Sequence, residues 1–186
     1  MSKDNWIRAG YQTFAYVGPS ELKVERLARS LQRSKSSFYH FFADLEVFTE
    51  HLLEYHLAQA KVIAAKEAQA QTEQELAQIL VAHKVDILFN RQLRFHRENP
   101  QFEACFHTTN QITTPAFLPL WKKIVGLEEE GFLADLVLAF SSENFYLQIT
   151  DQTLNEVWLL DYFQNIKRLF RQLRQSNSIS TVDGTV

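Results

Sequence analysis

Apolar residues recur every three to four positions along most of the chain, which is the period of amphipathic helices. The first apolar stripe includes Ile7, Tyr11 and Phe14, and Gly18-Pro19 ends it because proline cannot continue a helix. The later stripes predict helices at about 24–31, 35–41, 45–69, 73–90, 91–98, 101–111, 116–129, 132–149 and 153–175. No stretch alternates apolar and polar residues for long enough to predict a sheet. The predicted fold class is therefore all-α.

Single residues mark the ends of these helices. Ser34 and Asp44 are suitable N-caps for the helices that begin at 35 and 45. Breaks between the later helices are expected at Asn99-Pro100, Pro115, Gly131 and Thr150-Asp151. Residues 176–186 carry no periodic apolar set, so we expect a disordered tail there.

Three short helices joined by tight turns make up the first part of the chain. The third buries Phe38 and presents small polar, basic and aromatic groups, as the second helix of a helix-turn-helix unit does. Residues 1–43 hold seven Lys and Arg against three Asp and Glu, although the whole chain carries −3. A basic head on an acidic body favours a polyanionic partner. We therefore divide the chain into a DNA-binding head, residues 1–47, and a helical body, residues 48–175.

The segment from Gly18 to Phe48 reads GPSELKVERLARSLQRSKSSFYHFFADLEVF. Its apolar, capping and aromatic positions resemble, without a gap, the DNA-binding signature of the TetR family of transcriptional regulators. The matching positions are Gly18, Val24, Leu27, Ala28, Ser34, Lys35, Phe38, Tyr39, Phe42 and Phe48. The rest of the chain is similar to that family only in length and helical character.

The resemblance implies which residues meet DNA. Ser34 would cap the recognition helix and contact phosphate, and Lys35, Ser36 and Ser37 would lie over base edges and backbone. Tyr39 and His40 would reach phosphates that flank the major groove. A helix N-terminus with an added lysine suits phosphate, and hydroxyl groups let the helix approach the groove closely.

Three positions depart from the family's pattern. Gln32 stands in the turn where glycine is common, so this turn must tolerate a side chain. Phe41 stands where histidine is common, and Leu45 where a basic residue is common. We expect these losses either to weaken DNA binding or to shift its load to Lys23, Arg26 or Arg33.

The body carries more aromatic residues than a small helical core needs. We interpret them as the wall of a pocket for a small apolar effector, with few charges to pair with an ionic ligand. The alternative is that they pack together and leave no cavity. The predicted lining is Phe89, Phe95, His96, Phe102, Phe106, His107, Asn110, Phe117 and Trp121.

The last helix is apolar over more than half its circumference, so it must be covered on two sides. Its main seam repeats at alternating spacings of four and three residues, as in a coiled coil. This pattern predicts a homodimer. The resemblance to the TetR family implies that the last two helices form a four-helix bundle across the dimer, with the helix at 132–149 as the companion. The predicted interface is Phe132, Leu136, Phe140, Leu159, Phe163, Ile166 and Phe170.

Few features of the sequence support other classes of protein. The chain has no Glu-x-x-His pair, zinc-protease helix or Gly-rich phosphate loop, so we expect no metal, no cofactor and no enzyme. No apolar run approaches the roughly 18 residues that cross a bilayer, and the N-terminus lacks the apolar region of a signal peptide. With Cys105 as its single cysteine, the chain fits a reducing cytoplasm.

The function expected from these features is a ligand-responsive transcriptional regulator. It would bind a pseudo-palindromic double-stranded DNA operator as a homodimer, most simply as a repressor. The alternative is a helix-turn-helix DNA-binding protein without small-molecule sensing, controlled by a protein partner. An enzyme built on a helical bundle ranks third.

Overall fold

A computed structural model of the chain describes residues 2–127 and 131–180, with side chains described except at 131–133 and 173–180. Every regular element in these ranges is helical, which confirms the all-α fold class. The elements are α1 (Lys3–Val17), the 3-10 turn η1 (Pro19–Glu21), α2 (Val24–Ser30), α3 (Lys35–Tyr39), α4 (Leu45–Glu67), α5 (Glu73–Ala82), α6 (Lys84–Phe95), α7 (Pro100–Val125), α8 (Gly131–Gln148) and α9 (Glu156–Ser180). None of these helices, in the ranges described, is long and apolar enough to cross a membrane.

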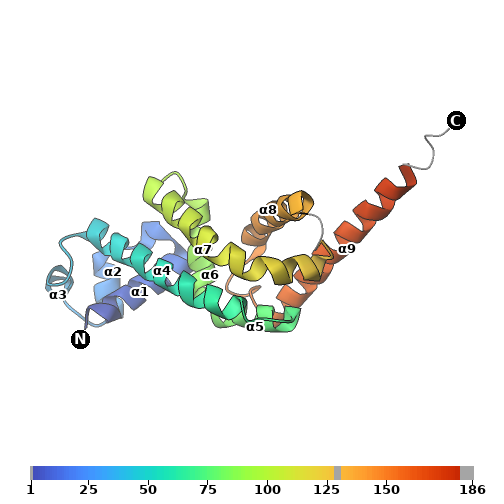
Figure 1. Cartoon of the computed structure of the whole chain (residues 1–186). Helices are drawn as coiled ribbons and strands as arrows, with labels where there is room; N and C mark the ends of the chain where they lie inside the picture. Colours follow the sequence, from blue (N-terminus) through green and yellow to red (C-terminus); the bar gives the residue numbers. More distant parts are fainter. Residues whose placement is uncertain (1, 128–130, 181–186) are drawn as a thin grey trace.

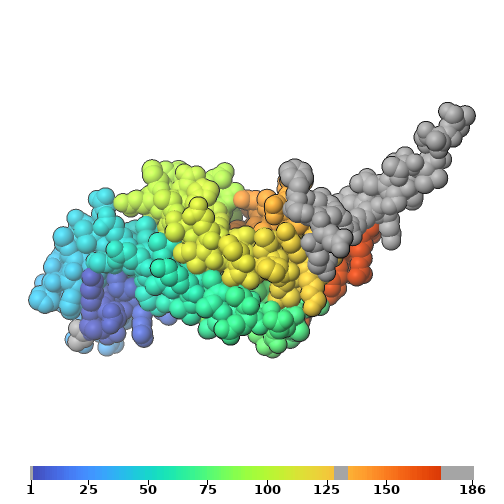
Figure 2. All heavy atoms as spheres, in the orientation of Figure 1, coloured from blue at the N-terminus to red at the C-terminus, as the bar shows by residue number. Residues whose placement is uncertain are grey.

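The helices form an elongated body, with α1, α2 and α3 at one end and the C-terminal part of α9 extending from the other (Figure 1). The long helix α4 connects the two ends and packs along α7. In the space-filling view, α4 and α7 lie side by side over much of the face that is drawn (Figure 2). α9 packs on α5 and α7 before it leaves the body.

The cap predicted at Asp44 is confirmed, because its Oδ1 accepts a hydrogen bond from the backbone N–H of Val47 at 2.9 Å. Ser34 occupies the N-cap position of α3, but its side chain makes no cap hydrogen bond. The Ser37 hydroxyl instead donates to the Ser34 carbonyl at 2.8 Å. The prediction that the Ser34 side chain caps this helix is therefore wrong, although the helix begins where expected.

The turn between α2 and α3 accommodates the side chain of Gln32, but the backbone of Gln32 is left-handed. Gln32 has φ 54°, and it alone among the non-glycine residues described has a positive φ. Its N–H donates to the Arg29 carbonyl at 3.1 Å, and the Arg33 N–H donates to the Ala28 carbonyl at 2.8 Å. These two bonds make a Schellman motif, whose left-handed position usually holds glycine.

Some predicted boundaries are wrong. α5 ends at Ala82 and α6 begins at Lys84, so the break does not fall at 90–91. α7 continues through Pro115, where we expected a break, and through Pro119. A proline removes one helical hydrogen bond, and here packing of α7 against α4 holds the helix together.

The predicted tail is partly helical. α9 continues to Ser180, so the prediction of disorder is wrong for 176–180, and residues 181–186 lie outside the described part. A helix already formed extends more easily than a new one starts, even through residues without an apolar stripe.

One hydrophobic core runs through the whole body and crosses the predicted domain boundary at residue 47. At one end, the Phe38 ring packs against those of Phe42 and Phe48 at centroid distances of 5.0 and 5.2 Å. Further along, the Phe89 ring of α6 stacks on Tyr11 and Phe14 of α1, at 4.3 and 4.1 Å. α1 is thus packed directly against the body as well as against α2 and α4.

Candidate functional site

The residues predicted to contact DNA gather around α3 at one end of the molecule. Phe38 is fully buried under α3, whereas Lys35, Ser36, Tyr39 and His40 are exposed. Tyr39, an aromatic residue, leaves 55% of its surface open to solvent. Ser34, Lys23 and Arg33 are exposed as well, but Ser37 is half-buried and its hydroxyl is engaged by the Ser34 carbonyl.

Ion pairs join the basic side chains of this end to its acidic ones. The Lys35 ammonium lies 2.8 Å from the Glu25 carboxylate of α2, and Lys23 lies 3.6 Å from Glu21. Arg26 also pairs with Glu21. Exposed pairs of this kind contribute about 0–1 kcal/mol, so they leave these cations able to turn toward an external anion.

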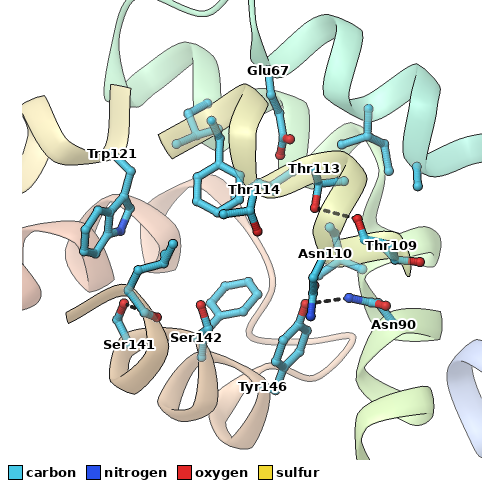
Figure 3. A pocket seen from close by; sticks show the side chains of 18 of the residues that line it. Glu67, Asn90, Thr109, Asn110, Thr113, Thr114, Trp121, Ser141, Ser142 and Tyr146 are labelled. Carbon is cyan, nitrogen blue, oxygen red and sulfur yellow. Dashed lines mark hydrogen bonds between the residues drawn. The ribbon is translucent and has the colours of Figure 1, made fainter. Parts of the chain in front are cut away.

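At the other end, a cavity of about 520 Å³ lies between α4, α5, α6, α7, α8 and α9 (Figure 3). Its volume falls within the range of small-molecule sites in proteins. The lining is mainly aromatic and aliphatic, with hydroxyl, amide and carboxyl groups among them. The alternative that the aromatic residues fill the body completely is therefore wrong.

One face of α7 forms a wall of the cavity. Phe106, Asn110, Phe117 and Trp121, all predicted to line a pocket, lie on this wall together with Thr113. Their spacings of three and four residues place them on one side of a continuous helix. The expected break at Pro115 hid this continuity, so Thr109, Thr113 and Thr114 were missed.

The other predicted lining residues lie away from the cavity, and for them the prediction is wrong. Phe89 and Phe102 are core residues that pack against Phe14 of α1. The Phe95 ring lies under the Arg91 guanidinium, 4.6 Å from it. The remaining two, His96 and His107, face solvent in part and lie near the carboxylates of Glu98 and Glu103 respectively.

A buried carboxyl group is the feature of the cavity that the sequence analysis missed. Glu67, in the last turn of α4, is 4% exposed and its Oε2 has no hydrogen-bond partner. Burial raises the pKa of Glu67 to about 7. Its side chain points into the cavity on the side of Thr113 and Thr114 (Figure 3). The only other buried side-chain atom without a partner, among the residues described, is Oγ1 of Thr109, which also lines the cavity.

A signal for Glu67 was present in the sequence. It follows His56, Ala60 and Ile63 at spacings of three and four residues, and all four line the cavity. A glutamate on a mostly apolar helix face is a candidate for a functional group, because burying an unpaired carboxyl is costly. The expectation that the body has few charges for an ionic ligand is thus wrong at Glu67.

Hydrogen bonds connect the cavity wall to α1. The Tyr11 hydroxyl of α1 donates to Asp86 Oδ1 at 2.8 Å and lies 2.7 Å from His56 Nδ1. Because the single phenolic proton goes to Asp86, His56 bonds the Tyr11 oxygen through its Nδ1–H, and the unprotonated Nε2 then lies 3.3 Å from Asn90 Oδ1, where neither atom can donate. Burial lowers the pKa of His56 to about 4, so its imidazole is neutral at physiological pH. Both His56 and Asp86 line the cavity.

The network extends from these residues to α8 and to the end of α4. Asn90 Nδ2 donates to the Tyr146 hydroxyl at 2.6 Å, and both residues line the cavity (Figure 3). His83 Nδ1 lies 2.9 Å from Asp86 Oδ2, and its Nε2 accepts from the Lys66 ammonium at 2.7 Å. These contacts join side chains of α4, α6 and α8 beside the cavity.

The residues predicted to form a dimer interface are divided between core and surface. Leu159 and Phe163 of α9 are buried within the protomer, so they are not interface residues. Leu136 and Phe140 of α8 are exposed, Phe140 by 70%. Ile166 and Phe170 are half-buried, and the Phe132 side chain lies outside the described part. Exposed apolar residues that were not predicted are Leu147 of α8 and Val157 and Leu169 of α9.

No protein-family model matches the chain, and no curated protein matches it either. Within the described ranges, no group of three His, Cys, Asp or Glu side chains is placed to hold a metal ion.

Proposed function

We propose that this protein is a DNA-binding transcriptional regulator whose affinity for DNA responds to a small molecule. The observation that supports the proposal is that one hydrophobic core holds together two different surfaces. An exposed polar and basic helix lies at one end, and a cavity of the size of a small-molecule site lies at the other. The resemblance of residues 18–48 to the TetR signature supports the first feature, and the aromatic lining supports the second.

DNA binding would use the surface around α3. Lys35, Ser36, Tyr39 and His40 point away from Phe38, which anchors the helix in the core. Lys23 and Arg33 extend the basic surface on the residues that precede α3. Phosphate contacts from such residues supply affinity, and base contacts from the helix supply specificity.

Self-association would use the exposed faces of α8 and α9. Leu136, Phe140 and Leu147 of α8 recur at helical spacing and stand out from the protomer. Exposed apolar side chains at helical spacing favour a protein partner. A second copy of this chain would bring two α3 helices to one duplex, as a pseudo-palindromic operator requires.

The first test is the salt dependence of DNA binding. Lys35→Ala should weaken binding to all duplexes and lower the slope of log K against log salt by about one, because one phosphate contact is lost. Lys123→Ala, at the exposed C-terminal end of α7, is the matched control and should leave the slope unchanged. Fluorescence anisotropy with genomic fragments near the protein's own gene gives both values. Absence of duplex binding by the wild type at low salt would refute the proposal.

A further inference from the structure

Glu67 gives the cavity a definite chemical preference. Its carboxyl is buried, is turned into the cavity and has an oxygen without a partner. A protein normally satisfies each buried polar atom, and an unsatisfied carboxylate is more costly than a neutral group. A ligand that supplies a proton donor at this point would therefore gain a strong, charge-assisted hydrogen bond.

The charges around the cavity favour a cation over an anion. Glu67, Asp86, Asp135 and Glu143 line it, and no Lys or Arg is among the described lining residues. Two of these carboxylates already have partners: Asp86 accepts hydrogen bonds from Tyr11 and His83, and Glu143 is paired with Arg94. Asp135 is exposed. Glu67 is thus the carboxyl that is both buried and available to a ligand.

We propose that the cavity binds a hydrophobic organic amine, whose ammonium group pairs with Glu67. The apolar part of the amine would lie against Phe106, Phe117 and Trp121, whose rings line the same cavity. The faces of such aromatic rings also attract cations. Calling this amine the effector rests on the proposed function, but its binding to the cavity does not.

The ionisation of Glu67 makes the binding of an amine measurable in a second way. With a pKa of about 7, Glu67 is partly protonated near neutral pH. Pairing with an ammonium requires the carboxylate, so the carboxyl proton of Glu67 leaves to solvent while the ammonium keeps its own. Binding therefore releases a fraction of a proton near pH 7, and the affinity rises as the pH increases through this pKa. A neutral ligand would favour protonated Glu67 or show no such dependence.

The experiment compares three probes with one skeleton: naphthylbutylamine, naphthylbutanol and naphthylbutanoate. Isothermal titration of the full chain, in two buffers that differ in ionisation enthalpy, gives both the affinity and the number of protons released. We expect the amine to bind about ten- to a hundredfold more tightly than the alcohol, because the free energy of one charge-assisted hydrogen bond corresponds to such a ratio of affinities. The butanoate should bind most weakly of the three.

Two variants assign the effect to Glu67. Glu67→Gln keeps the size of the side chain and should remove the preference for the amine and the proton release, while binding of the alcohol changes little. Glu50→Gln, on an exposed position of the same helix, is the matched control and should keep both. Circular dichroism establishes that each variant is folded.

Three results would overturn the proposal: no binding of the amine at millimolar concentration, equal affinities for amine and alcohol, or a preference for the butanoate. An amine preference that survives in Glu67→Gln would overturn it as well. Because these titrations contain no DNA, they are independent of the regulator proposal. Amine binding without duplex binding would refute only the regulator, and duplex binding without an amine preference would refute only the amine.

Discussion

Replacing Glu67 by glutamine should make the protein more stable, and by an amount that depends on pH. Glutamine has nearly the shape of a protonated glutamate but cannot ionise in the buried position. In the folded wild type the pKa of Glu67 is about 7, against an ordinary value of 4.5. The folded state therefore holds the proton over a pH range in which the unfolded chain has already released it.

The magnitude follows from the difference between these two pKa values. Each pKa unit corresponds to 1.36 kcal/mol, so the ionised carboxyl costs the folded state about 3 kcal/mol above pH 7. Below about pH 4.5 both states are protonated and the cost vanishes. Between these limits, the free energy of unfolding of the wild type falls as the pH rises, relative to that of Glu67→Gln.

Urea unfolding of both proteins at equal concentration, at several pH values between about 5 and 8, measures this difference. Near pH 8, the advantage of about 3 kcal/mol should raise the melting temperature of the variant by roughly 6–12 °C for a chain of this length. His56 has the opposite effect: it lowers the free energy of unfolding as the pH falls from 6.5 toward the His56 pKa of about 4. Its contribution cancels because both proteins contain it. A difference between the two proteins that is constant with pH would refute the argument.

Three further substitutions test the packing. Gln32→Gly should raise the free energy of unfolding by about 0.5–1 kcal/mol in urea, because glycine relieves the left-handed strain but gains freedom when unfolded; a loss of stability would contradict this. Gly10→Ala should lower it by about 1–3 kcal/mol, because the new Cβ would lie 2.3 Å from Phe48 Cζ; Phe48→Leu in the same chain should recover part of the loss. Phe140→Asp should give a monomer with unchanged helix content, since this side chain is 70% exposed in the protomer; a wild type that sediments as a monomer at micromolar concentration would refute the dimer.

The all-α fold could be predicted because apolar periodicity is a local property of the sequence. The start of α4 could be predicted for the same reason, since Asp44 caps a residue three positions away. The path of α7 could not, because the effect of Pro115 depends on the helices that surround it. Packing against α4 decided the outcome there, and local propensity alone favours a break.

The cavity was foreseen more accurately than its lining. The abundance of aromatic side chains indicated a pocket, but not which rings face it. Phe89 and Phe106 are equivalent by residue type, yet Phe89 stacks on Tyr11 and on Phe14 while Phe106 lines the cavity. That distinction arises from the packing of α1 on α6, which brings together residues far apart in the sequence.

The position of Glu67 connects the cavity to the far end of the molecule. α4 begins beside the Phe38–Phe42–Phe48 cluster and ends, about 33 Å away at 1.5 Å per residue, with Glu67 in the cavity. A ligand that pairs with Glu67 touches the last turn of this helix, and the cavity wall beside it is hydrogen-bonded to Tyr11 of α1. A ligand shifts the equilibrium between two arrangements of a protein only by the difference in its affinity for them. A hydrogen bond to Glu67 provides such a difference if this carboxyl is less accessible in one of the arrangements. Allosteric coupling of about 1–3 kcal/mol is similar to the value of one charge-assisted hydrogen bond. In the proposed regulator, this single contact would shift the balance between two arrangements of the α3 surfaces by about ten- to a hundredfold.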